Sequence, residues 1–374
     1  MTVYLDHNAT APVRPEAKDA VVRALEVGGN PSSVHAAGRA ARNLIETARQ
    51  QVADLVGVKV GSVTFTSGGT ESNALAIESA VAAGFDRIIL GGTEHGAVGE
   101  NVRAAKVPVA LWPVNAEGVA DLDWLKDELS KGGRPLVCLM LANNETGVIQ
   151  PVAEASALVR EAGGWLHVDA VQAAGKIAID FTDLGADTLA LAAHKIGGPF
   201  GSGALIAGTR STVVRRLHGG GQERGRRAGA ENLTGIAGFG AAAVAAVRDL
   251  PHVAEQARWR DAMQARVEEA GVVILGKGAP RLPQTLGFAA AGFDAQMQVM
   301  GMDLAGVMIS AGPACSSGKM KPSEVVAAMG RADLAPFAVR ISGGWTTTQD
   351  DWSRAGDAWL ELYARHLSRR KEVA

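Results

Sequence analysis

Short apolar segments alternate with longer segments of helical periodicity between residues 63 and 206. Seven of them are expected to be strands, because each is short, almost continuously apolar and bounded by glycine or polar residues. They are 63–66, 87–90, 107–111, 136–141, 165–168, 188–191 and 203–206. Segments such as 71–83 and 152–162 have helical character and separate most of the strands. The alternation predicts an α/β fold, a mainly parallel seven-stranded sheet with helices on both faces.

The pattern changes after residue 208. A glycine- and arginine-rich loop at 218–229 has little capacity for regular structure, and an alanine-rich helix is expected near 233–249. The rest of the chain is expected to form a helix at 253–270, short strands near 272–275 and 285–288, and two further helices. We therefore predict a large domain at 14–249 and a smaller α+β domain made of 1–13 and 250–374. The smaller domain carries a cysteine-containing loop, expected to be mobile, at about 310–320.

Composition narrows the class of protein. The 374 residues are 47% hydrophobic and 20% charged, as in an ordinary soluble globular protein with a sizeable core. The net charge of −2 does not indicate a nucleic-acid or membrane partner. No signal peptide is recognised, and no apolar run reaches the ~18 residues that a membrane span needs. With two cysteines there is no disulfide framework, so cytoplasmic residence is expected.

Lys195 follows the apolar run 188–193 and precedes a glycine-rich turn. Burying an unpaired ammonium is costly and lowers its pKa, and such lysines form Schiff bases with carbonyl compounds, including pyridoxal phosphate. A lysine that snorkels into water at a strand end is the alternative. Asp169, at the end of another short apolar strand, favours the first interpretation, because a pyridoxal enzyme needs an acid beside its pyridine nitrogen.

Other polar groups also follow predicted strands, at the edge of a parallel sheet where ligands bind. Gly69 and Thr70 lie in a strand–turn–helix segment that suits a phosphate, although a simple helix cap would look the same. His95 could stack on a flat cofactor or transfer protons, or it could be a hydrogen-bonded structural histidine. Asn144 could be a turn residue, or its amide could donate to a phenolic oxygen.

Two residues of the second domain are candidates for substrate chemistry. Cys315 lies among small residues in 310–318, where an accessible thiol is a candidate nucleophile and a chance loop cysteine is the alternative. Cys138 lies inside an apolar strand and is expected to be a buried structural residue. Arg340 lies in a short apolar segment and could bind a carboxylate or form a structural ion pair. The basic loop 224–227 could recognise an anion or a neighbouring subunit, or be solvated surface.

Taken together, these segments resemble the cysteine desulfurases, pyridoxal-phosphate enzymes of aminotransferase class V and fold type I. The resemblance covers essentially the whole chain. It is carried by Tyr4-Leu-Asp-His-Asn-Ala-Thr10, Thr66-Ser-Gly-Gly-Thr-Glu-Ser72, His167-Val-Asp-Ala-Val-Gln172 and Ala193-His-Lys195, with 30–35, 93–95, 143–147, 218–225 and the cysteine loop. Each segment alone is a weak signal, and their common order and compatible spacing make it a strong one.

The resemblance implies a role for each candidate residue. Lys195 would form the Schiff base and Asp169 would pair with the pyridine nitrogen. His95 would stack on the ring and could also act as a catalytic acid or base. Asn144 and Gln172 would contact the phenolic oxygen. The phosphate would be held by Gly69, Thr70 and His194, and the substrate carboxylate by Arg340 with Asn144.

The implied reaction converts L-cysteine to L-alanine and leaves a persulfide on Cys315. It would supply sulfur to an acceptor such as an iron–sulfur scaffold protein, or to another thiolation pathway. A homodimer is implied, with 218–230 near the partner's site. No intrinsic metal site is expected, with transient iron–sulfur ligation by Cys315 left open. The alternatives are another class V enzyme, a transaminase or a selenocysteine or cysteine lyase, and a non-catalytic binding protein with the same fold.

Three positions depart from the usual pattern of that family. Ala192 replaces a serine that would touch the phosphate, Ala230 replaces a threonine offered by the partner subunit, and Trp345 replaces an arginine. Losing a hydrogen bond to a charged group costs roughly 1.5–3 kcal/mol when nothing compensates. We therefore expect weaker cofactor binding unless Ser202 or the arginine-rich loop compensates.

Overall fold

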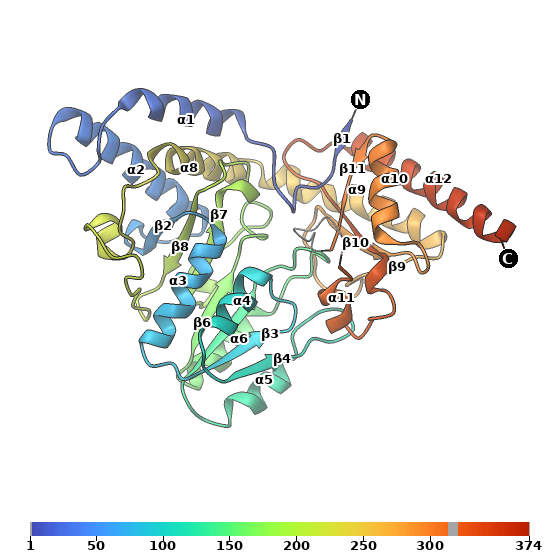
Figure 1. The fold of residues 1–374 in the computed structure, drawn as a ribbon, viewed down its shortest axis with the longest axis horizontal. Helices are drawn as coiled ribbons and strands as arrows, with labels where there is room; N and C mark the ends of the chain where they lie inside the picture. The colour runs from blue at the N-terminus through green and yellow to red at the C-terminus, as the bar shows by residue number, and fades with distance from the viewer. Residues whose placement is uncertain (1, 313–320, 374) are drawn as a thin grey trace.

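A computed structural model describes residues 2–312 and 321–373. The chain forms two lobes, and the N-terminal segment, blue in Figure 1, runs between them from the strand β1 to the helix α1. The larger lobe is built on a seven-stranded sheet and the smaller lobe on a four-stranded sheet.

The seven predicted strands are present and form the large sheet, in the order β2-β8-β7-β6-β5-β3-β4. Strand β8 is antiparallel to β2 and to β7, and the remaining neighbours are parallel. The mainly parallel seven-stranded sheet expected from the sequence is therefore confirmed. The bounds are β2 (Val63–Thr66), β3 (Arg87–Gly91), β4 (Val109–Trp112), β5 (Pro135–Met140), β6 (Trp165–Asp169), β7 (Thr188–Ala192) and β8 (Gly203–Ala207).

Helices cover both faces of this sheet, and alternate residues of each strand face opposite layers. In β5, Leu136 and Cys138 pack with α3 (Gly69–Ala82) and α4 (Gly96–Ala104). Val137 and Leu139 pack in the opposite layer. That second layer is formed by α2 (Ala36–Leu55), α5 (Leu122–Leu129), α6 (Val152–Glu161), α7 (Phe181–Leu184) and α8 (Leu233–Arg248).

The alanine-rich helix α8 is the expected helix near 233–249. It packs against α1 (Pro15–Val27) and α2, and its small residues allow a close approach. A Cβ atom on Gly240 would lie 2.6 Å from the Cα of Ala48, so only glycine permits this spacing. The apolar composition of α8 is therefore explained by packing on two sides.

The smaller lobe has a four-stranded antiparallel sheet in the order β12-β13-β10-β9, and a separate parallel pair β1-β11. Its strands are β1 (Val3–Tyr4), β9 (Val273–Ile274), β10 (Thr285–Ala289), β11 (Val307–Met308), β12 (Ser310–Ala311) and β13 (Ala338–Ser342). Its helices are α9 (Leu250–Glu269), α10 (Ala295–Leu304), α11 (Glu324–Ala328) and α12 (Gln349–Val373). Phe288, Trp352 and Trp359 are fully buried in its core. The hydrophobic cores of the two lobes are separate clusters of buried residues. We therefore propose two domains, a large one at 14–249 and a small one made of 1–13 and 250–374.

Within the part of the chain that the structure describes, no single helix is long and apolar enough to cross a membrane. Helices α8 and α9 meet that length and composition only when they are joined across a 59° bend.

Candidate active site

A cavity of about 280 Å³ opens at the carboxyl ends of β5, β6 and β7, on the face of the sheet covered by α3 and α4. Its position follows from the topology, because parallel strands end at the same edge. The lining combines a lysine, a carboxylate, two histidines, several amides and small apolar residues: Gly69, Thr70, Asn73, His95, Ala97, Met140, Ala142, Asn144, Asp169, Val171, Gln172, Ala192, His194 and Lys195. Of the ten residues predicted for the site, eight are therefore gathered at one cavity.

Lys195 enters the cavity from a short 3₁₀ turn (Ala193–Lys195) that directly follows β7. Burial lowers the pKa of its amine to about 8, and the nearby Arg340 adds to this effect while Asp6 and Asp169 oppose it. The ammonium donates hydrogen bonds to the carbonyl oxygens of Asn8 at 2.6 Å and Ala9 at 2.8 Å. Lys195 is thus a half-buried amine of depressed basicity that faces a cavity.

Asp169 ends β6 and is held by two hydrogen bonds. Its Oδ2 accepts from Asn73 Nδ2 at 2.8 Å, and its Oδ1 accepts from the Val171 N–H at 3.0 Å. Asn73 comes from α3, and its Oδ1 lies 2.9 Å from His167 Nε2. The other ring nitrogen of His167 lies 3.0 Å from the hydroxyl of Thr188. Burial lowers the pKa of His167 to about 3, so the ring is neutral and has a structural role.

Sequence reasoning did not find Asn73. It lies within the helical segment 71–83, where an asparagine is an ordinary helix residue, and no local pattern links it to Asp169. Only the packing of α3 on β6 brings the two side chains together.

His95 caps the N-terminus of α4, where its Nδ1 accepts a hydrogen bond from the Ala97 N–H at 3.0 Å. Its neighbour Glu94, which sequence reasoning also missed, turns into the protein. One oxygen of Glu94 accepts from the Met140 N–H, and the other is buried without a partner among the described residues. Burial, reinforced by the nearby Asp169, raises the pKa of Glu94 well above its usual range. The raised pKa favours the neutral form of the Glu94 carboxyl group.

The residues predicted to contact phosphate and phenolic oxygens surround the rest of the cavity. Gly69 and Thr70 begin α3, so N–H groups of its first turn are available to an anion. Gln172 donates to the Asn8 carbonyl at 2.9 Å, and its Oε1 is buried with no partner in the described chain. The ring of His194 stacks on Phe200 with centroids 5.2 Å apart, and burial lowers its pKa to about 4.

Arg340, on β13, does not line this cavity. Its guanidinium donates to the Asn144 carbonyl at 2.9 Å and to Asp6 Oδ1 at 2.6 Å. Its buried Nε has no partner within the described residues. The ion pair that the sequence left as an alternative is therefore present, and donors remain on the same guanidinium. Cys315 lies outside the described residues. Cys138 is fully buried, and burial raises the pKa of its thiol well above the usual value.

The three departures from the family pattern lie in different surroundings. Ala192 lines the cavity, whereas Ala230 faces a separate hollow of about 170 Å³ that also contacts Ser67 and Arg227. Trp345 donates to the Pro12 carbonyl at 3.0 Å and lies under the guanidinium of Arg14. Ser202 does not line the cavity, and its buried hydroxyl has no partner in residues 2–312 and 321–373. The hydroxyl missing at Ala192 is thus not replaced by Ser202.

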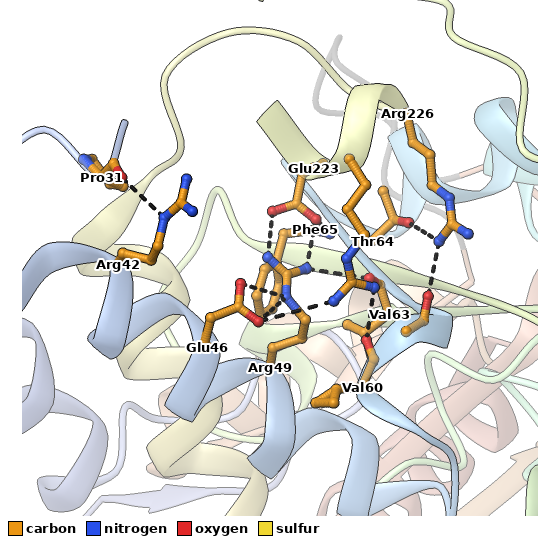
Figure 2. A network of polar contacts seen from close by, with 12 residues as sticks. Pro31, Arg42, Glu46, Arg49, Val60, Val63, Thr64, Phe65, Glu223 and Arg226 are labelled. Carbon is orange, nitrogen blue, oxygen red and sulfur yellow. Dashed lines mark hydrogen bonds and ion pairs between the residues drawn. The ribbon is translucent and has the colours of Figure 1, made fainter. Parts of the chain in front are cut away.

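The arginine-rich loop is engaged in contacts of its own. Arg227 forms an ion pair with Glu71 at 2.9 Å, and Arg226 donates to Gly61 O and Thr64 Oγ1. In Figure 2, Glu223 of the same loop faces Arg49 of α2. This pair is bidentate, with distances of 2.6 and 2.8 Å, and both side chains are buried.

A lysine of lowered pKa and a fixed carboxylate at one edge of a mainly parallel α/β sheet define a class of protein, that of pyridoxal-type lysine enzymes. Comparisons with known proteins agree. The aminotransferase class V profile matches residues 3–354. "Cysteine desulfurase IscS" of Dictyoglomus turgidum is 38% identical, with 93% of this chain and 91% of that protein covered. "IscS-like cysteine desulfurase" of Mycobacterium tuberculosis is 37% identical, with 99% and 98% covered.

Solved structures give the same result. The NifS-like protein of Rickettsia africae superposes with a TM-score of 0.90 at 32% identity, over 97% of this chain and 100% of that one. The chain therefore belongs to the class V aminotransferases and, within them, to the cysteine desulfurase family. The resemblance seen in the sequence is confirmed.

Proposed function

We propose that the protein is a cysteine desulfurase that converts L-cysteine to L-alanine and transfers the sulfur to Cys315 as a persulfide. The observation that carries the proposal is that Lys195 and Asp169 line one cavity together with His95 and Gln172. Relatives that are 37–41% identical and named cysteine desulfurase support the same reaction.

The residues that line the cavity fit pyridoxal phosphate. Asp169 offers a fixed carboxylate to a pyridine nitrogen, Lys195 offers an amine to an aldehyde, and the first turn of α3 at Gly69 and Thr70 suits a phosphate. His95 would lie on the ring, and Asn144, Gln172 and His194 would hold its polar groups. When bound, this cofactor supplies an electron sink for charge left at the substrate Cα.

Arg340, Lys195 and Cys315 would then act on the substrate. Arg340 binds the substrate carboxylate with Asn144, using donors that remain beside its bond to Asp6. Lys195 removes the Cα proton and returns it later, which its pKa of about 8 permits near neutral pH. The Cys315 thiolate attacks the substrate sulfur. An S–S bond forms, the Cβ–S bond breaks with its electron pair left on carbon, and a proton completes the methyl group of alanine.

We further propose a cytoplasmic homodimer that passes persulfide sulfur to an acceptor protein such as an iron–sulfur scaffold. The IscS names of similar proteins support this setting.

The test is an assay of alanine and sulfide released from L-cysteine, with persulfide on Cys315 measured by mass spectrometry. Lys195→Ala is expected to abolish both products, and Cys315→Ala to abolish the persulfide. Cys138→Ala is the matched control, because that thiol is buried and its loss should leave turnover intact. Undiminished sulfide release by Cys315→Ala would contradict the proposal.

A further inference from the structure

The N-terminal segment 6–14 contacts residues of the site although none of its own residues lines the cavity. Figure 1 shows this segment crossing between the two lobes. Asn8, at its centre, is 1% exposed. Nothing in the reaction proposed above uses Asn8, so its contacts call for an explanation.

The backbone carbonyl of Asn8 accepts from two residues of the cavity, Lys195 Nζ at 2.6 Å and Gln172 Nε2 at 2.9 Å. The next carbonyl, that of Ala9, accepts from the same Lys195 Nζ at 2.8 Å. Two carbonyl oxygens therefore receive the lysine amine together. Hydrogen bonds to a charged donor are among the stronger ones in proteins.

The side chain of Asn8 holds these carbonyls in place by bonding to both domains. Its Nδ2 donates to the Asn144 carbonyl at 3.2 Å and to Thr285 Oγ1 at 3.0 Å. Its backbone N–H donates to Ser342 Oγ at 3.0 Å. Asn144 belongs to the cavity, whereas Thr285 and Ser342 belong to β10 and β13 of the small domain. Asn8 is thus fixed from both sides.

The main chain around Lys195 is fixed as well. The carbonyls of His194, Lys195 and Ile196 accept from Ala11 N at 2.9 Å, Lys176 Nζ at 2.9 Å and Arg14 Nε at 2.8 Å. With the backbone held at three successive residues, the side chain of Lys195 is the part that can move between the cavity and the Asn8 and Ala9 carbonyls.

We propose that the carbonyl oxygens of Asn8 and Ala9 form a docking site for the Lys195 amine in every state in which that amine is free, and that Asn8 is the positioning residue of this docking site. The inference rests on the proposed function and deepens it. A lysine that a substrate amine releases from the cofactor needs a defined place from which it can return. The docking site would supply this place and keep the charged amine from leaving the cavity.

Charged side chains on several elements affect the pKa of the docked amine. Arg340 of β13 opposes its charge, whereas Asp6 of the same N-terminal segment and Asp169 of β6 favour it. The ammonium of Lys176 also lies near, bound to the Lys195 carbonyl. The side chain of Asn8 bonds to none of these charged groups, so Asn8→Ala removes no charge and no direct partner of a charge from around the amine.

The test measures how fast the Lys195 amine reacts with acetic anhydride in the full chain. The protein is loaded with pyridoxal phosphate, stripped with hydroxylamine and acetylated, and the Lys195 peptide is quantified by mass spectrometry. Asn8→Ala removes the side-chain bonds to Asn144 and Thr285 that hold the two carbonyls in place. It is expected to speed acetylation of Lys195 about tenfold, the change that follows when the charged amine loses a hydrogen bond to a displaced carbonyl. Thr285→Val, which removes one partner of the Asn8 side chain, should act in the same direction with a smaller change.

Gln298→Ala is the matched control. Gln298 is also a buried amide with several hydrogen bonds, to Phe293 O, Phe337 O and Trp359 Nε1, but it lies in the small domain away from the cavity. Return of the visible absorbance band on reloading shows that a variant is still folded.

Equal acetylation rates in the wild type, Thr285→Val and Gln298→Ala would overturn the docking site even if Asn8→Ala did not fold. Failure of the wild type to gain a visible band or release alanine would instead overturn the proposed function. The acetylation rate does not depend on that result, so the two failures are distinguishable.

Discussion

Asn73 connects the cavity carboxylate to the interior of the large domain. Its amide bonds to Asp169 on one side and to the neutral ring of His167 on the other. Because all three side chains are buried, a lost partner could be replaced only from within the protein or from the cavity. The orientation of Asp169 therefore depends on a residue that itself also lines the cavity.

We expect Asn73→Ala to lower the free energy of unfolding by about 1–3 kcal/mol, because it leaves buried polar atoms without a partner. It should also weaken binding of pyridoxal phosphate, since Asp169 loses one of its two hydrogen bonds. Chemical denaturation and titration with the cofactor measure the two effects. Asn101→Ala, on α4, removes a single local hydrogen bond to the Ala97 carbonyl and serves as the control. Equal cofactor affinity in both variants would exclude this role for Asn73.

Glu94 gives a prediction with a defined pH dependence. Its pKa is raised in the folded protein, so above the ordinary value of 4.5 the native state holds a proton that the unfolded state has lost. Stability contributed by this group therefore falls as the pH rises from about 5 towards the folded pKa, by about 1.4 kcal/mol for each pH unit. Glutamine cannot ionise, so a Glu94→Gln variant does not lose stability in this way as the pH rises.

The free energy of unfolding of Glu94→Gln, relative to the wild type, should accordingly rise between pH 5 and pH 8. Urea denaturation at several pH values measures it. Glu26→Gln, an exposed change on α1, is the control variant. A difference for Glu94→Gln that stays constant with pH would mean that Glu94 is charged in the native protein.

At the scale of elements, the loop 218–230 is held by one buried ion pair. Glu223 accepts from Arg49 of α2 through both oxygens, and from the Phe65 N–H of β2 at 2.9 Å (Figure 2). Glu223 and Arg224 both adopt left-handed backbone conformations, with φ of 49° and 57°. This conformation is unfavourable for such residues, so the pair stabilises a turn that the local sequence does not favour.

We expect Glu223→Ala to cost about 3 kcal/mol of unfolding free energy, because the buried Arg49 guanidinium loses its main partner. Arg49 keeps its hydrogen bonds to Glu46 and to the Val63 carbonyl, which limits the loss of stability. The double change Arg49→Met with Glu223→Met should cost less than the single one, since no buried charge remains. Glu46→Ala, which removes a half-exposed partner, should cost at most about 1 kcal/mol. A double variant less stable than Glu223→Ala would contradict this account.

The large sheet could be predicted from the sequence because each of its strands is a short, largely apolar segment with a local boundary. The residues at the strand ends, such as Asp169 and Lys195, could be predicted with it. The contacts that hold these residues in place could not be predicted, because they depend on packing between distant parts of the chain. Asn8 and Thr285 are 277 positions apart, and Glu94 differs from an ordinary loop carboxylate only in its burial.

At the scale of the whole molecule, large apolar side chains remain exposed on the larger lobe. Leu25 on α1, Val34 before α2 and Leu217 before the loop 218–230 are 68%, 88% and 49% exposed. Val34 precedes α2, which carries Arg49, Leu217 precedes the loop that carries Glu223, and α1 packs against α2. The resemblance places the partner subunit near this loop. Burial of such side chains would favour association.

We therefore expect the protein to sediment as a dimer and Val34→Glu to shift it towards the monomer, because a charge would be buried in the interface. Leu304→Glu is the matched control: Leu304, at the end of α10 in the small domain, is also 88% exposed. Sedimentation velocity of the wild type and both variants over a range of concentrations measures the equilibrium. If Leu304→Glu dissociates the dimer and Val34→Glu does not, the interface lies on the small domain, and the loop 218–230 cannot serve a partner's site.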